Sequence, residues 1–237
     1  NSLYMIKRNY YDLHKQNLIT TKNKIDVSLF EEQIKIFPFQ KWGDMYPELE
    51  RYATPLVNRS GIQADPEDES IGPLDRTNFL KTYPEHKYQI WTDEHLRDWK
   101  SYFSPGGLKL DEMLLENHFQ MKCPALSITS LDPIDEIKPY MYRSSILKWN
   151  YGAHFLRHYD NWFPAQWIRL WGTTRPDRMV LRYEEGHTGQ MVEEMAIEPG
   201  RLYLHDSVKP HEALAYRDGV YQFFIALDPE CLKIGIF

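Results

Sequence analysis

The sequence predicts a mainly β protein with some α structure, in which a helical N-terminal layer packs on a C-terminal jelly roll, a double-stranded β-helix. In the first half of the 237-residue chain, apolar residues recur at helical spacing. From about residue 126 the apolar spacing becomes period two, and short β-rich runs alternate with Gly, Pro and Asp-Gly turn signals. Short strands at such intervals are typical of a β-sandwich or jelly roll.

Helical patterns occupy much of the N-terminal half. The first has Asp26 or Ser28 as its N-cap. A brief strand is expected over 54–61, and Pro and Gly predict a loop over 62–75. Another loop, 104–107, separates the last two helices. We expect these helices over residues 26–37, 42–53, 92–103 and 110–121.

The C-terminal half is expected to hold the β core. Gly152 is placed to bend the first long β-rich run, and residues 186–190 read as a hairpin turn. We expect a single domain over 1–237, with the N-terminal layer at 1–125 and the β core at 126–237. The expected strand regions are 144–160, 166–174, 178–185, 190–198, 201–206 and 215–228, the last interrupted by an Asp-Gly turn.

Composition excludes several functional classes. The net charge is 28 − 34 = −6, so no basic surface for nucleic acid or anionic membrane is expected. No apolar run approaches the length of a membrane span, and the N-terminus lacks an apolar targeting segment. The two cysteines, Cys123 and Cys231, have no metal-type spacing and fit a reducing compartment. We therefore expect a cytoplasmic protein with neither nucleic-acid nor membrane partners.

A metal site is predicted from three residues. His158 and Asp160 end a predicted strand, and residues i and i+2 of a strand point to the same face. His211 follows a later strand, after a turn that we expect Asp206 to cap. Two imidazoles and one carboxylate on one face of an octahedron leave three positions open, which suits non-haem Fe(II).

Other histidines are alternatives. His154 lies four residues before His158 and would share its face on an unbroken strand. His205 could take the place of His211. A structural ion pair between His158 and Asp160, with His211 as an ordinary turn residue, would explain the same residues without a metal.

The C-terminal segments also resemble a known family. LRHYD (156–160), WIRLWGTTRP (167–176), EPGRLYLHDSVKPH (198–211) and FFIALD (223–228) stand in the order of the aspartyl/asparaginyl β-hydroxylase-like branch of the Fe(II)/2-oxoglutarate-dependent dioxygenases. This branch includes bacterial free-proline hydroxylases. The resemblance implies a distorted double-stranded β-helix and an oxidoreductase that uses Fe(II), 2-oxoglutarate and O₂. Its substrate would be a small amino acid, an amino-acid-like acid or a peptidyl residue, and Asp160 favours hydroxylation over halogenation.

The resemblance also implies a cation for the far carboxylate of 2-oxoglutarate. Arg169 is the best candidate, because a guanidinium binds a carboxylate in bidentate fashion. It stands where the family usually has His. The family's closing-strand Arg is missing here, and Gln222, or Tyr221 with a one-residue slip, occupies its place. Thr173 could add a hydrogen bond.

Candidate substrate-binding residues are Asn58, Arg143 and Trp149. Asn58 ends the brief strand of the N-terminal half, and Arg143 precedes the strand that leads to His158. Trp149 shares the inward alternation and could form a wall, as could Trp162 and Trp167.

Two other functional classes fit parts of the pattern. One is a cupin-like metalloprotein without 2-oxoglutarate chemistry, such as an isomerase or a small-molecule binding protein. The other is an interaction module that has lost its metal. Anaerobic addition of Fe(II) and 2-oxoglutarate, followed by air, separates these classes from an oxygenase.

Overall fold

The computed structural model describes residues 16–41, 51–58, 123–124, 128–141, 144–158, 168–207 and 209–236. Several predicted segments lie outside these ranges, namely the helices at 92–103 and 110–121 and the loops at 62–75 and 104–107.

The described strands form two antiparallel sheets. The larger sheet has eight strands in the order β1-β10-β7-β12-β5-β3-β2, with β4 paired to β3. The smaller sheet has the order β6-β11-β8-β9. The strands are β1 (Leu18–Lys24), β2 (Gln40–Lys41), β3 (Arg51–Asn58), β4 (Cys123–Pro124), β5 (Ser144–Trp149), β6 (His154–His158), β7 (Ile168–Thr173), β8 (Met179–Glu184), β9 (Met191–Glu193), β10 (Arg201–His205), β11 (His211–Ala215) and β12 (Val220–Leu227).

The path of the chain through these sheets is that of a double-stranded β-helix. From β5 to β12 each connection crosses from one sheet to the other, except for the β8–β9 hairpin, which stays in the smaller sheet. The two inner faces enclose one apolar cluster, to which Trp149 and Trp171 of the larger sheet and Leu181 and Tyr183 of the smaller contribute. The fold class predicted from the sequence is therefore confirmed.

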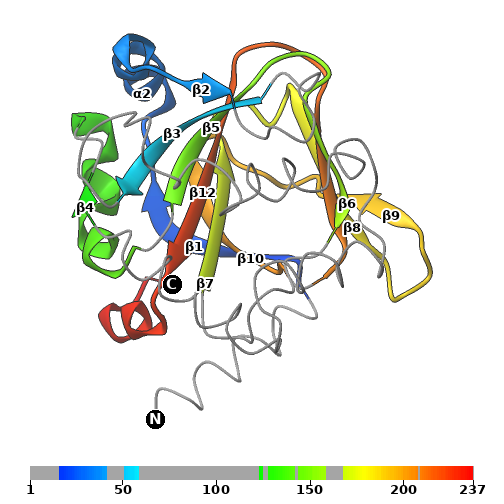
Figure 1. Cartoon of the computed structure of the whole chain (residues 1–237). Coiled ribbons are helices and arrows are strands. Elements are labelled where there is room, and N and C mark those ends of the chain that lie inside the picture. Colours follow the sequence, from blue (N-terminus) through cyan, green and yellow to red (C-terminus); the bar gives the residue numbers. More distant parts are fainter. Residues whose placement is uncertain are drawn as a thin grey trace, which may run out of the picture.

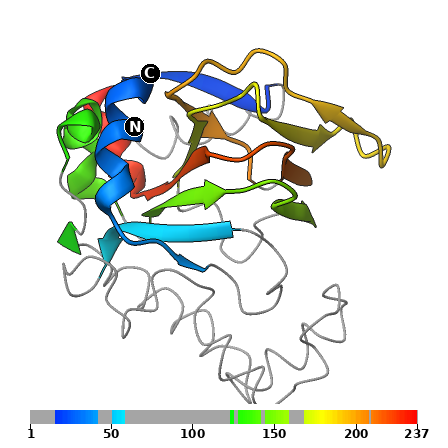
Figure 2. The same ribbon diagram turned by 90° about the horizontal axis from the view of Figure 1, so that it is seen from above.

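A small helical layer covers the outer face of the larger sheet. It consists of α2 (Val27–Gln33), η1 (Ile34–Ile36), η4 (Thr129–Tyr140) and η5 (Pro229–Ile234). Figure 1 shows the blue, green and red helices on one side of this sheet and the smaller sheet on the other, and Figure 2 gives the same layers from above. None of the described helices is long and apolar enough to cross a membrane.

The first predicted helix is confirmed with its cap. Asp26 accepts a hydrogen bond from the Leu29 backbone N–H at 3.0 Å, so it satisfies one of the free N–H groups of the first turn. Phe30 and Ile34 follow at i, i+4 spacing and are fully buried in the core between this layer and the sheet.

Two predictions for the N-terminal and central parts were wrong. Residues 51–53, expected to end a helix over 42–53, begin β3, while 42–50 lie outside the described residues. Pairing with β5 outweighs the helical spacing here, because Arg51 and Ala53 face partners on that strand. The period-two pattern was expected from residue 126, but Thr129–Tyr140 is a 3₁₀ helix and the regular strands begin at Ser144.

The predicted turns in the β core are confirmed. Gly152, with φ +81°, lies in the turn that separates β5 from β6. Residues 185–190 connect β8 and β9, and the Glu185 N–H donates to the Gln190 carbonyl at 2.8 Å. Gly219, with φ +73°, precedes β12 as the Asp-Gly signal predicts.

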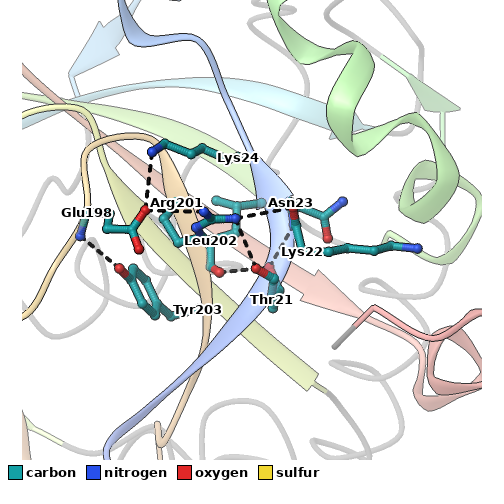
Figure 3. Close-up of polar contacts among 8 residues, drawn as sticks. All are labelled: Thr21, Lys22, Asn23, Lys24, Glu198, Arg201, Leu202 and Tyr203. Atoms are coloured by element: carbon teal, nitrogen blue, oxygen red, sulfur yellow. Dashed lines mark hydrogen bonds and ion pairs between the residues drawn. The ribbon is translucent and has the colours of Figure 1, made fainter.

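The edge strand β1 holds β10 in place. The Thr21 hydroxyl donates to the Leu202 carbonyl at 2.7 Å, and the Arg201 guanidinium donates to the Thr21 carbonyl at 3.4 Å (Figure 3). The same guanidinium donates to Glu198 at 3.2 Å. These bonds fix the strand that ends at His205.

The turn before β10 generates a stability prediction. Gly200 has φ +74°, and a Cβ there would lie 2.3 Å from the Ile25 carbonyl oxygen. Gly189 has φ +80° with nothing within 4 Å of its Cβ position. We expect Gly189→Ala to lower the free energy of unfolding by about 1 kcal/mol and Gly200→Ala by about 3 kcal/mol or more, because only the second adds a backbone clash. Urea unfolding measures both, and equal losses would contradict the close approach.

Candidate metal centre

Strands β6 and β11 bring two predicted ligands together. His158 and His211 are direct cross-strand partners in the smaller sheet, and their ring centroids lie 4.4 Å apart. His211 is buried and His158 is partly exposed at the end of its strand. Two imidazoles this close can be directed at one ion.

A β-bulge in β6 turns His158 towards the interior. Phe155 pairs with Ala213, but His158 pairs with His211, so three steps on β6 match two steps on β11. Phe155 and His158 therefore share the inner face, with ring centroids 5.3 Å apart.

The same bulge removes His154 from the site. His154 pairs with Leu214, the neighbour of the inward-facing Ala213, and so lies on the outer face. On an unbroken strand His154 and His158 would have shared a face. The bulge is pinned from outside, because the Arg157 guanidinium donates to Glu184 Oε1 at 2.7 Å.

Backbone carbonyls set the orientation of both imidazoles. His158 Nδ1 lies 2.6 Å from the Leu156 carbonyl oxygen, and His211 Nδ1 lies 2.8 Å from the Lys209 carbonyl oxygen. A carbonyl oxygen only accepts, so each Nδ1 carries a proton, and in the neutral form of each ring the lone pair is on Nε2. This arrangement is common among metal-binding histidines, whose second nitrogen is held by a hydrogen bond.

The predicted cap of the turn before His211 is present. The Lys209 backbone N–H donates to Asp206 Oδ1 at 3.3 Å, and Asp206 is buried. The cap holds the residue whose carbonyl orients the His211 ring.

A third imidazole adjoins the pair. His205, at the end of β10, has its ring centroid 4.6 Å from that of His211, and its Nδ1 is hydrogen-bonded to the Tyr183 hydroxyl. Burial lowers the pKa of His205 well below its usual value, and the nearby charges of His211, His158 and Arg169 act in the same direction. His205 is therefore a neutral imidazole at neutral pH, and its ring lies beside that of His211.

The third predicted ligand, Asp160, lies outside the described residues. Within the ranges that the structure describes, no group of three or more His, Cys, Asp or Glu side chains is arranged to hold a metal. The set His158, Asp160 and His211 thus remains a prediction, of which the structure places two members side by side.

The predicted cosubstrate residues all lie on the inner face of the larger sheet. Thr173 and Gln222 are cross-strand partners on β7 and β12, and both are buried. Arg169, four residues from Thr173 along β7, pairs with Ala226, and its guanidinium carbon lies 5.0 Å from the Phe224 ring centroid. Gln222 Oε1 has no hydrogen-bond partner among the described residues.

Tyr221, the alternative to Gln222, faces the opposite way. Its ring packs edge-on against Phe30 of α2, with centroids 5.6 Å apart, in the outer core. Gln222 is therefore the residue of the two that points between the sheets.

Of the predicted substrate residues, the structure describes Trp149 in full. Its side chain is completely buried on the inner face, with its ring centroid 5.5 Å from that of Phe155 and no hydrogen-bond partner for Nε1 among the described residues. The Asn58 backbone pairs with Cys123, but its side chain is not described. Arg143, Trp162 and Trp167 lie outside the described residues.

Sequence analysis missed one interior cation, Arg51. It is the cross-strand partner of Trp149, is only 4% exposed, and has its guanidinium carbon 4.0 Å above the Phe155 ring centroid. The incorrect helix over 42–53 concealed it. A period-two reading of residues 51, 53 and 55, just before an apolar run, would have indicated a strand here instead of a helix.

Comparison with known proteins gives distant likenesses. No protein-family profile and no curated protein matches the sequence. An oxidoreductase of the 2OG-Fe(II) oxygenase family from Burkholderia pseudomallei is 8% identical with a TM-score of 0.44, over 94% of this chain and 89% of that one. A Klebsiella pneumoniae protein with a double-stranded β-helix domain is 12% identical (TM-score 0.26; 38% and 64% covered). Peruvianin-I, a cysteine peptidase from Thevetia peruviana latex, is also 12% identical (TM-score 0.29; 38% and 52% covered).

This chain thus spans about half of peruvianin-I and less than two thirds of the Klebsiella protein. Likenesses this weak carry no argument about function. The strand order and the inward imidazoles define the class directly: the chain is a double-stranded β-helix protein with a histidine cluster between its sheets.

The contact between Tyr183 and His205 generates a prediction. Tyr183→Phe would leave a buried imidazole nitrogen without this partner, so we expect the free energy of unfolding to fall by about 1–3 kcal/mol. Tyr216→Phe is the control, because its hydroxyl donates to the Asp177 carbonyl on the exposed side, and its loss should stay within about 0.5 kcal/mol. Urea unfolding distinguishes them, and an unchanged Tyr183→Phe protein would refute the role of the hydroxyl.

Proposed function

We propose that this chain is a non-haem Fe(II)/2-oxoglutarate-dependent oxygenase that hydroxylates an amino acid, an amino-acid-like acid or a peptidyl residue. His158, Asp160 and His211 are the proposed metal ligands. The observation that carries the proposal is the cross-strand His158–His211 pair, with both Nδ1 atoms bound to backbone carbonyls.

The donor set fits Fe(II). Two neutral imidazoles with Nε2 lone pairs, together with one carboxylate, suit a divalent iron with open positions for a cosubstrate and O₂. Asp160 follows His158 by two residues, the spacing that directs alternate side chains of an extended strand to one side. Bound iron with 2-oxoglutarate would supply the oxidising chemistry, in which R–H, O₂ and 2-oxoglutarate give R–OH, succinate and CO₂.

The protein's part in this chemistry is to bind, orient and exclude water. Arg169, Gln222 and Thr173 are proposed to contact the cosubstrate from the inner face of the larger sheet, where Gln222 and Thr173 are buried. Trp149 is proposed as an apolar wall, with Arg143 and Asn58 as further substrate contacts. The apolar lining of Phe155 and Trp149 favours ligand groups that have lost their water.

The metal proposal is tested with four alanine variants. Anaerobic Fe(II) and 2-oxoglutarate should give the wild type a weak visible absorption band, and air should then release succinate. His158→Ala, His211→Ala and Asp160→Ala should lose the band and lower succinate release by about 100-fold or more. His154→Ala is the matched control, because it lies on the same strand but on the outer face, and it should keep both signals.

Full succinate release by Asp160→Ala or His158→Ala would refute these ligands. A wild-type protein that binds a divalent metal but neither gives the band nor releases succinate would instead be a cupin-like metalloprotein without 2-oxoglutarate chemistry. A protein that binds no metal would be an interaction module.

Arg169→Met tests the cosubstrate proposal. Loss of an interior guanidinium should raise the 2-oxoglutarate concentration needed for half-maximal succinate release by about tenfold or more. Arg182→Met is the control, because that side chain pairs with Glu212 on the outer face of the smaller sheet at 3.2 Å. An unchanged requirement in Arg169→Met would remove this residue from cosubstrate binding.

A further inference from the structure

Two guanidinium groups reach the space between the sheets from different strands. Arg169 lies on β7, next to the strand that carries His205, and its charge helps to lower the pKa of that buried histidine. Arg51 on β3 lies beyond β12 and β5 in the strand order. Three strand spacings separate β7 from β3, or about 14 Å across the sheet, so the two cations serve different parts of the interior.

The strand partner of Arg51 offers a buried donor to an acceptor group. Its cross-strand partner Trp149 is fully buried, and the Trp149 Nε1–H has no hydrogen-bond partner among the described residues. An indole N–H and a guanidinium are donors only. A buried indole N–H left unsatisfied costs about 1–3 kcal/mol, so a ligand oxygen that accepts from Trp149 Nε1 is favoured.

Gln222 adds a second unsatisfied polar atom on the same face. Its Oε1 has no partner among the described residues, and its register neighbour Leu147 is two residues from Trp149 on β5. Rotation of this amide can present its NH₂ group instead of its oxygen. Trp149 on β5 lies between the strands that carry Gln222 and Arg51, so all three residues line neighbouring strands of one face, and a carboxylate is a group that accepts from several N–H donors at once.

The position of this site relative to the histidines defines the ligand. The Phe155 ring centroid lies 5.3 Å from that of His158 and 4.0 Å from the Arg51 guanidinium carbon, so the cation and the imidazole pair adjoin the same aromatic ring. We infer that Arg51, with Trp149 and Gln222, binds the far carboxylate of the 2-oxo diacid cosubstrate. The inference rests on the proposed function. It assigns Arg169 to the opposite end of the same 2-oxo diacid, the end that lies towards the histidines.

Ligand binding in the absence of turnover tests the assignment. The Mn(II)-loaded protein is titrated calorimetrically without oxygen, with 2-oxoglutarate and with 2-oxopentanoate, which has the same chain length but no far carboxylate. The wild type should prefer 2-oxoglutarate. Arg51→Met should reduce this preference by about tenfold or more, through weaker 2-oxoglutarate binding alone.

Matched variants separate the two arginines. Arg51→Lys should keep part of the preference for 2-oxoglutarate, because lysine retains the charge without the planar guanidinium. Trp149→Phe should reduce this preference several-fold. Arg169→Met should weaken both ligands by a similar factor. Thermal unfolding of each variant identifies one that fails to fold, and if Arg51→Met does so, Arg51→Lys and Trp149→Phe decide the result.

The inference is overturned if Arg51 and Trp149 variants keep the wild-type preference, or if Arg169→Met loses it while Arg51→Met does not. A wild-type protein that binds neither 2-oxo acid contradicts the proposed function itself. The two failures are therefore distinguishable.

Discussion

The contact between His158 and His211 is the constraint on which the site depends. The two imidazoles come from strands that are far apart in sequence, and they meet because β6 and β11 pair in one register. A one-residue slip in that register would turn His158 to the outer face. The bulge in β6, held from outside by the Arg157–Glu184 ion pair, fixes the register that the histidines need.

The rest of the fold supports this contact from both sides. The larger sheet supplies His205, Arg169 and Gln222 on its inner face, and the helical layer covers its outer face with Phe30, Ile34 and the buried side of η4. Apolar side chains of the larger sheet are therefore buried on both of its faces. Long apolar side chains such as Phe223 and Ile225 point outward to the helices, while their neighbours Gln222 and Phe224 point inward. This alternation lets one strand serve both the core and the site.

Much of this arrangement could be predicted from the sequence, because the C-terminal strands depend on local signals. The Asp-Gly turn before β12, the bend at Gly152 and the hairpin after β8 each follow from residues that adopt positive φ, and the alternating pattern places Trp149 inside. The close approach of His158 and His211 was also expected, since His158 at the end of one strand and His211 at the start of another were predicted to bind the same metal.

The remaining features depend on tertiary pairing. No local sequence signal in residues 154–158 predicts a bulge, so the outward position of His154 follows only from the register between β6 and β11. Sequence analysis missed Arg51 because the short segment before Pro55 has a pattern that also fits the end of a helix. Its strand structure depends on pairing with β5. His205 was considered only as a substitute for His211, whereas the fold places the two rings side by side.

The most direct test of the metal centre is anomalous diffraction from crystals grown with Mn(II) or Fe(II). The account predicts one anomalous peak about 2 Å from Nε2 of both His158 and His211, and bonded to the Asp160 carboxylate. A metal bound elsewhere, or histidine side chains whose Nε2 atoms diverge in the metal-loaded crystal, would contradict it.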